Sequence, residues 1–233
     1  IACPGSFALE ENTPRRQTGF ADEGLAAHKV AEWALKDGRF NAGAYLGRTV
    51  AIKQGWGGTT KTINITVTAD MCRHVQTYIN AIKARMDKYK RQKNVKNVSL
   101  FIEKRLDTSA VLGVPQQSGV ADIVMVVEYK NGEGLVSVED LKYGANVKVE
   151  AKDNTQLMTY AAAAIEEYKG KLKINRAIVA IHMPRLGFVS ECSLTAAKLK
   201  AFVAILRTGT QKAIEQRKLF KINGADVLTL VPG

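Results

Sequence analysis

Three polar residues in the second half of the chain have types and a spacing suited to metal-dependent hydrolysis. Asp122 stands in a stretch otherwise made of Val, Ala, Ile and Met, and Asp140 and Lys142 are two positions apart. Burying an isolated carboxylate is costly unless it is paired or binds a metal ion. Taken alone, each pattern favours a simpler interpretation. Asp122 would then bond backbone amides at a strand start, and Asp140 and Lys142 would form a weak surface ion pair.

Two segments that carry these residues are predicted to form a β-hairpin. Residues 120–129 are apolar on both faces, which is typical of a central strand in a covered sheet. Asn131-Gly132 is a hairpin turn signal, and residues 135–142 are predicted as the returning strand. The hairpin therefore carries the first carboxylate on one arm and the acid–lysine pair on the other.

The length of the hairpin loop decides whether the three side chains can meet. Side chains alternate along a strand, so Asp140 and Lys142 share a face. A three-residue loop, such as residues 131–133, places Asp122 opposite Lys142 and near Asp140. A two-residue loop places Asp122 opposite Leu141, on the wrong face. We therefore predict an odd loop or a bulge after the first strand.

Two predicted helices carry further polar residues that could join this set. Gln156 and Tyr160 are four residues apart on a helix predicted over residues 154–168, so they share a face. His28 lies on a helix predicted over residues 21–36. The simpler interpretations are a capping-region glutamine with a half-buried tyrosine, and a histidine bonded to the carboxylate one turn further along its own helix.

The pattern as a whole predicts one domain of mixed α/β type (α+β mixed), with a central mixed sheet flanked by helices. Residues 1–95 are expected to be mainly helical, with a loop and a short helix in the glycine-rich segment 38–58. Residues 96–191 are expected to hold the sheet, and residues 192–233 to form a C-terminal helix and tail. Further predicted elements are a helix over 70–93, strands over 97–106, 174–182 and 187–191, and a closing helix over 194–217.

The charge balance indicates a polyanionic partner. The chain has 34 Lys and Arg against 22 Asp and Glu, a net charge of +12, and nucleic acid is the expected partner. A basic surface with no partner is the alternative. No apolar run approaches membrane-spanning length, the start lacks a signal-peptide pattern, and we find no basic amphipathic helix with an aromatic apolar face, so no membrane partner is expected. The three cysteines lack the spacing of a disulfide framework or a zinc site, which indicates a reducing compartment and hence a cytoplasmic location.

Four short motifs occur in the order found in RecB-type nucleases of the PD-(D/E)XK superfamily. They are Gly24-x-x-x-His28, Gly119-x-x-Asp122, Asp140-Leu141-Lys142 and Gln156-x-x-x-Tyr160. The stretch EDLKYGANVKVEAKDNTQLMTYA, and the opening CPGSFALEE with ADEGLAAH, resemble a phage and prophage branch of that group. The resemblance runs from about Cys3 to Arg185. It implies a restriction-endonuclease-like core and a RecB-like, metal-binding nuclease.

The resemblance also implies which residues hold the metal. His28, Asp122 and Asp140 resemble the ligands, together with the backbone carbonyl of Leu141. Glu103, on the preceding strand, resembles an acidic position that some relatives use near a second metal. One or two Mg²⁺ or Mn²⁺ ions are expected, since such ions offset phosphate charge and activate water. An imidazole ligand suits Mn²⁺ better than Mg²⁺, so we expect activity with either ion and none with Ca²⁺ alone.

The remaining motif residues resemble those that act on the substrate. Lys142 resembles the residue that orients the attacking water and offsets charge on the phosphate. Gln156 and Tyr160 resemble the helix pair that lines the site and helps to hold Lys142 or the scissile phosphate. Some relatives bind an iron–sulfur cluster through one early and three clustered late cysteines. Here Cys192 is the only cysteine in the final third, so no cluster is expected, and Cys3 is expected to be a packing residue.

Basic residues near the motifs are the expected DNA contacts. Arg15 and Arg16 precede the His28 helix, and Lys148 and Lys152 lie between Lys142 and the next helix. A denser run of Lys and Arg spans residues 83–96. The commoner outcome for such a run is a solvated helix face, and the alternative is a surface that tracks phosphates.

The expected function is a DNA-binding hydrolase, namely an exonuclease that resects DNA ends in phage recombination and repair. The resemblance suggests a single-strand annealing protein as partner, a homo-oligomer as one possible assembly, and the host cytoplasm as the location. One alternative is a structure-specific endonuclease of the same fold, which would also cut closed circles. Another is a catalytically inactive DNA-binding relative. The retained set of His28, Asp122, Asp140 and Lys142 argues against that last interpretation.

Overall fold

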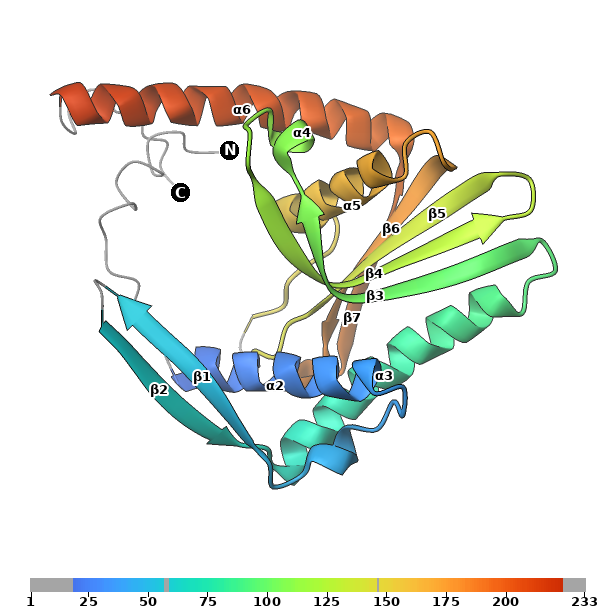
Figure 1. The fold of residues 1–233 in the computed structure, drawn as a ribbon, viewed down its shortest axis with the longest axis vertical. Helices are drawn as coiled ribbons and strands as arrows, with labels where there is room; N and C mark the ends of the chain where they lie inside the picture. Colours follow the sequence, from blue (N-terminus) through green and yellow to red (C-terminus); the bar gives the residue numbers. More distant parts are fainter. Residues whose placement is uncertain (1–18, 57–58, 146, 224–233) are drawn as a thin grey trace.

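The computed structural model describes residues 19–56, 59–145 and 147–223, and the labels of Figure 1 are used below. Cys3, Arg15 and Arg16 lie outside the described residues. The helices are α2 (Gly19–Lys36), η1 (Ala42–Tyr45), α3 (Ala69–Lys90), α4 (Ser109–Leu112), α5 (Thr155–Glu167), η2 (Pro184–Leu186) and α6 (Ala196–Asn223). The strands are β1 (Thr49–Trp56), β2 (Thr59–Thr66), β3 (Val95–Asp107), β4 (Ser118–Tyr129), β5 (Glu133–Leu141), β6 (Lys173–Met183) and β7 (Phe188–Thr195).

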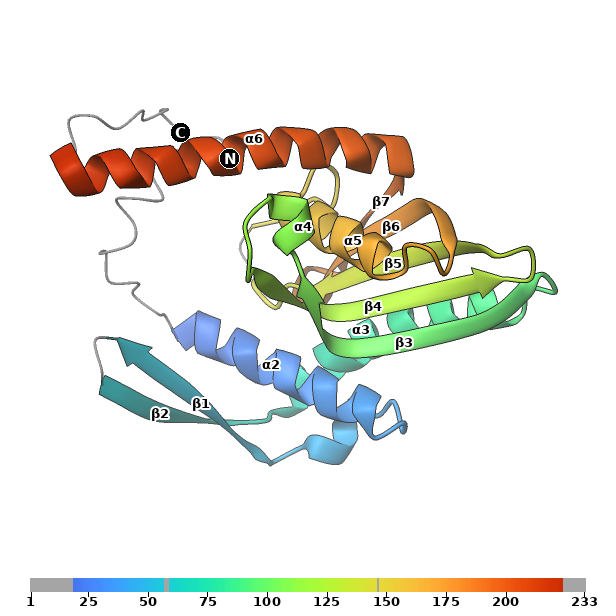
Figure 2. The same cartoon turned by 45° about the horizontal axis from the view of Figure 1, so that its top comes forward.

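A five-stranded mixed sheet forms the centre of the molecule, in the order β3-β4-β5-β6-β7. Neighbouring strands are antiparallel except β5 and β6, which are parallel. Parallel neighbours need a crossover connection, and α5 supplies it. Figure 2 shows α5 and α6 on one side of the sheet and α3 on the other. The predicted mixed α/β class, with a central mixed sheet between helices, is confirmed.

Strands β4 and β5 are covered on both faces, as the apolar pattern predicts. Val124 and Val136 belong to the core that includes α5, whereas Met125 and Leu135 belong to the core beside α3. All four side chains are at most 2% exposed. Because side chains alternate along each strand, two apolar layers on one strand require an almost unbroken apolar sequence.

The β4–β5 hairpin has the odd loop that the sequence predicts, but one residue earlier than expected. Residues 130–132 link the two strands, and Gly132, at the last loop position, has φ +81°. Its amide donates to the Tyr129 carbonyl over 3.1 Å. A type I turn followed by a left-handed residue is a common three-residue hairpin loop. The position of the left-handed residue sets the register of the β4–β5 pairing. The expectation that Asp122 faces Lys142 is wrong by two residues, because this register sets Asp122 opposite Asp140.

Helices α2, η1 and α3 make up most of the described N-terminal part. This part also contains a β-hairpin, which corrects the expectation of a loop over residues 38–58. β1 and β2 pair along their whole length, and the ribbon lies against α2, outside the main sheet (Figure 1). Val50 and Ile52 of β1 are buried in the same core as α2. The alternation of buried and exposed residues in β1 was not recognised from sequence, because the segment is rich in glycine. In the described part of the chain, no helix is long and apolar enough to cross a membrane.

Candidate metal centre

Three carboxylates lie in a row across three adjacent strands. In the β3–β4 pairing, Ile102 faces Ile123 and Lys104 faces Ala121, so Glu103 lies opposite Asp122. The β4–β5 pairing reaches Ile123 and Glu139, and its next step sets Asp122 opposite Asp140. Glu103, Asp122 and Asp140 therefore mark one line across the sheet. Glu103 also has a φ of +52°, a left-handed conformation that is rare for a residue other than glycine and is concentrated at functional sites.

Asp122 marks the point at which the β4–β5 ladder stops. One of its carboxylate oxygens, Oδ2, accepts a hydrogen bond from the Leu141 amide over 2.7 Å. A side chain thus satisfies a backbone donor at the end of the paired region. This bond holds the carboxylate beside the end of β5, so both Asp122 and the Asp140-Leu141-Lys142 motif belong to one site.

Helix α2 brings His28 to the same carboxylate. Ala27, Val30 and Ala31 are buried against the core of the N-terminal part and fix the helix. His28 Nδ1 lies 3.3 Å from Asp122 Oδ2. The alternative in which His28 bonds the acid of its own next turn does not hold, because that acid, Glu32, accepts from lysines on either side at 2.6 and 2.7 Å.

His28, Glu103 and Asp122 form a set that could hold a metal ion. One ligand atom from each lies within 4.8 Å of the other two. The three residues line a cavity of about 10 Å³, which is about the space of one water molecule or ion. One imidazole with two carboxylates is a donor set that Mn²⁺ accepts readily and Mg²⁺ less so. The residues present therefore fit the expected ion.

Burial and mutual repulsion perturb the acids of this site. Burial, and then the charge of Asp122, raise the pKa of Glu103. Burial and Asp122 likewise raise the pKa of Asp140, while Lys142 partly offsets the rise. Burial alone would lower the pKa of His28, but its hydrogen bond to Asp122 and the nearby acids outweigh burial and raise it. The acids thus lack sufficient positive charge nearby, which a divalent cation would supply.

Asp140 and Lys142 form an ion pair beside the three-residue set. Asp140 is 5% exposed, and its Oδ2 lies 2.7 Å from Lys142 Nζ. Lys142 follows the end of β5, and its amide donates to the His182 carbonyl over 2.9 Å. The structure therefore groups Glu103 with His28 and Asp122, and places Asp140 next to them with the lysine. Leu141 lines the small cavity.

The motif Gly119-x-x-Asp122 contacts the motif Gln156-x-x-x-Tyr160 through Gly119 and Tyr160. Tyr160 lies on α5, which is capped by Asn154: the side-chain oxygen of this residue accepts a hydrogen bond from the Leu157 amide. A Cβ atom on Gly119 would lie 2.5 Å from Tyr160 Cε1 and 2.7 Å from Oη. The glycine at the start of β4 thus makes room for the tyrosine ring. Gln156 lies on the same helix with its side chain exposed.

Replacing Gly119 with alanine is expected to force the Tyr160 ring out of its place. Such crowding typically costs about 1–3 kcal/mol of unfolding free energy. Gly119→Ala should therefore lower the melting temperature, and the same substitution in a Tyr160→Ala background should cost much less. Thermal unfolding of the two single variants and the double variant measures this coupling. Equal costs of Gly119→Ala in both backgrounds would contradict the proposed contact.

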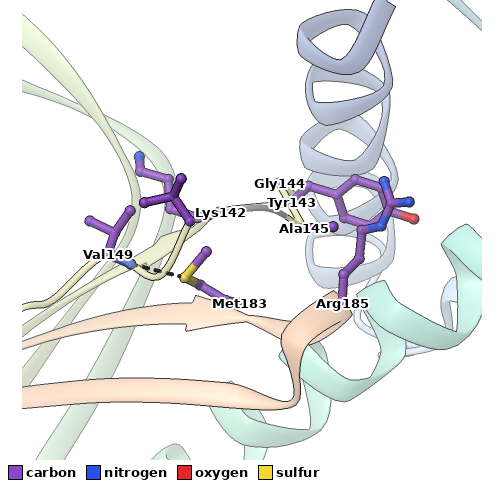
Figure 3. A pocket seen from close by; sticks show the side chains of 8 residues that line it. Lys142, Tyr143, Gly144, Ala145, Val149, Met183 and Arg185 are labelled. Carbon is purple, nitrogen blue, oxygen red and sulfur yellow. Dashed lines mark hydrogen bonds between the residues drawn. The ribbon is translucent and has the colours of Figure 1, made fainter.

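A second cavity is lined in part by Lys142. It has a volume of about 260 Å³ and is lined by the segment that follows β5 and by residues near η2. Figure 3 shows Lys142 and Val149 at one side of it, and Tyr143 with Arg185 at the other. The Arg185 guanidinium lies 5.1 Å from the centre of the Tyr143 ring.

The predicted DNA-contacting lysines lie in this region and are exposed. Lys148 Nζ lies 4.8 Å from the centre of the Phe188 ring, and Lys152 is exposed just before α5. The end of the denser basic run lies elsewhere, because residues 94 and 95 pair with residues beside the β4–β5 turn. That turn is at the opposite end of β4 from Asp122, about 20 Å away at the usual rise per residue.

A buried charged cluster on the other face of the sheet was not anticipated. Glu139 is fully buried, and its carboxylate lies 2.7 Å from His182 Nε2 and 2.5 Å from Arg85 Nε. Arg85 also donates to Glu191 over 2.5 Å. The dense basic run had placed Arg85 on a solvated surface, whereas it ties α3 to the sheet. The sequence held one sign of this cluster. Glu139 directly precedes Asp140 on the predicted strand, so its side chain must point to the opposite face of the sheet.

Together these features define a mixed α/β protein with a histidine and three acids at the end of a strand ladder. The chain belongs to the family described as "Protein of unknown function (DUF2800)", whose sequence model matches residues 1–226. That match covers nearly all of the described elements, including every residue of the candidate site.

Proposed function

We propose that this protein is a Mg²⁺- or Mn²⁺-dependent deoxyribonuclease of the RecB-like PD-(D/E)XK type. The observation that carries the proposal is the meeting of His28, Glu103 and Asp122 around one small cavity, directly beside the Asp140–Lys142 ion pair. Acids around a cation, with a lysine next to them, are the groups that hydrolysis of a phosphodiester requires.

Each residue has a role that its position allows. His28, Glu103 and Asp122 would hold the ion, with Asp140 at its side. A bound divalent ion would offset the charge of the phosphate and make a water molecule more nucleophilic. The Lys142 ammonium group lies 2.7 Å from Asp140, from where it would orient that water and stabilise the negative charge that develops on the phosphate.

DNA is the proposed substrate. The net charge of +12 favours a polyanion, and Lys148 and Lys152 are exposed on the segment between Lys142 and α5. Action on DNA ends, in phage recombination or repair with a single-strand annealing partner, is proposed from the resemblance of the sequence motifs. A structure-specific endonuclease and an inactive DNA-binding relative are the other outcomes of the test.

Digestion of end-labelled linear DNA and of closed circular DNA tests the proposal. Both single- and double-stranded forms, labelled at either end, are followed over time with Mg²⁺, Mn²⁺, Ca²⁺ or excess chelator. We expect linear DNA to be degraded from its ends with Mg²⁺ or Mn²⁺, and closed circles to be spared. Cleavage of the circles would indicate an endonuclease. Cleavage in excess chelator would contradict the metal-dependent mechanism, and retardation of DNA without cleavage under any condition would favour a binding protein.

A further inference from the structure

A buried tyrosine on α3 has a hydroxyl group without a partner in the described structure. Tyr78 is 2% exposed, and no described residue forms a hydrogen bond with its Oη atom. Its ring packs edge-on against His182, with the ring centres 5.1 Å apart. Burying a hydroxyl without a hydrogen bond is unfavourable, and such groups in native proteins call for an explanation, such as a bound water or ion.

The position of Tyr78 supplies that explanation. Tyr78 lines the same small cavity as His28, Glu103 and Asp122. The tyrosine reaches it from α3, whereas the histidine reaches it from α2 and the acids from the sheet. Burial, followed by the charges of Asp122 and Glu139, raises the pKa of Tyr78 well above its ordinary value. The hydroxyl therefore keeps its proton at neutral pH and can act as a donor.

The surroundings of the ring hold the Tyr78 side chain in place. His182, against which the ring packs, is itself held through its Nε2 atom by the buried Glu139 carboxylate. Arg85, further along α3, binds that same carboxylate. The cluster on the far face of the sheet thus anchors α3 at two points. A ring held in this way loses little conformational entropy when its hydroxyl finds a partner.

We propose that Tyr78 is a positioning residue of the metal centre. Its hydroxyl group donates a hydrogen bond to the single water molecule for which the shared cavity has room, and it thereby orients that water relative to the divalent ion that the ligand atoms of His28, Glu103 and Asp122 would hold beside it. This inference rests on the proposed function, because it requires His28, Glu103 and Asp122 to hold the ion. It adds to that function a residue that none of the four sequence motifs contains.

The test is a titration of the full chain with Mn²⁺, without DNA, in which electron paramagnetic resonance measures the free ion. The variants are Tyr78→Phe, which removes only the hydroxyl, and Tyr89→Phe as a matched control. Tyr89 is a buried tyrosine on the same helix, in the core beside the far part of α3. We expect Tyr78→Phe to weaken Mn²⁺ binding about ten-fold, the usual effect of losing a residue that supports metal ligands. Tyr89→Phe should leave the affinity unchanged.

The melting temperature of the metal-free protein separates this role from a structural one. Tyr78→Phe should not lower it, since the substitution removes a buried group that had no partner. A lowered metal-free melting temperature with unchanged Mn²⁺ affinity would overturn the inference. Asp122→Asn serves as the reference for the site itself. If that variant loses Mn²⁺ binding and Tyr78→Phe does not, only the role of Tyr78 fails; if Asp122→Asn binds as the wild type does, the metal site fails with it.

Discussion

Replacing Lys142 with alanine should reduce DNA cleavage in saturating Mg²⁺ by about a hundred- to a thousand-fold, the usual cost of removing one group that stabilises transition-state charge. The ammonium group lies 2.7 Å from Asp140, and Lys142 is not one of the residues that line the acidic cavity. Mn²⁺ binding should therefore persist in the variant, while the rate of hydrolysis falls. Single-turnover cleavage of labelled linear DNA and a Mn²⁺ titration measure the two effects separately.

Lys148→Ala is the matched control for this prediction. Lys148 is exposed and packs over Phe188, so its loss should weaken DNA binding and flatten the salt dependence without slowing the step of hydrolysis. Equal cleavage by Lys142→Ala and the wild type would contradict the catalytic role of Lys142. Absence of cleavage by both would instead favour a DNA-binding protein that has lost its activity.

The parts of the site that could be predicted depend on local patterns. The alternation of side chains, together with the turn signal at Asn131-Gly132, was enough to predict an odd loop and therefore a shared face for Asp122 and Asp140. Which residue faces which depends on where the left-handed position falls in the loop. Gly132 occupies the last place of that loop, and this detail of turn conformation moved the register by two residues.

The parts that could not be predicted depend on pairing between distant segments. Glu103 joins His28 and Asp122 only because β3 pairs with β4 in one particular register. Arg85 turns inward because it forms an ion pair with a buried acid on β5, Glu139. The run of basic residues on α3 does not reveal this contact, because it depends on how α3 packs against the sheet. Tyr78 could be recognised from sequence as part of an apolar helix stripe, but the lack of a partner for its hydroxyl is a property of the folded core.

Asp122→Asn should abolish cleavage and weaken Mn²⁺ binding by more than about a hundred-fold, beyond the usual effect of losing a supporting residue. Asp122 contacts both His28 and the end of β5. Its Oδ2 atom lies 3.3 Å from His28 Nδ1 and accepts a hydrogen bond from the Leu141 amide over 2.7 Å. The asparagine side-chain oxygen can still accept that amide, so the fold should persist. Glu128→Gln, on the same strand at its other end and paired with Lys96, is the control and should change neither property.

The same variant should also change how the stability of the metal-free protein depends on pH. The raised pKa of His28 means that its protonated pair with Asp122 stabilises the fold below the ordinary pKa of 6.5, and this contribution is lost as pH rises through the folded-state value. The raised pKa of Glu103 and of Asp140 means that their ionised forms cost stability at higher pH, in part because of Asp122. Asp122→Asn removes the pair with His28 and the share of the raised pKa of the two acids that is due to Asp122, whereas the share due to burial remains. The variant should therefore be less stable than the wild type near pH 6 and at least as stable near pH 8.5. Chemical unfolding at the two pH values measures the difference, and a stability gap that widens with rising pH would show that Asp122 does not govern the charges of this site.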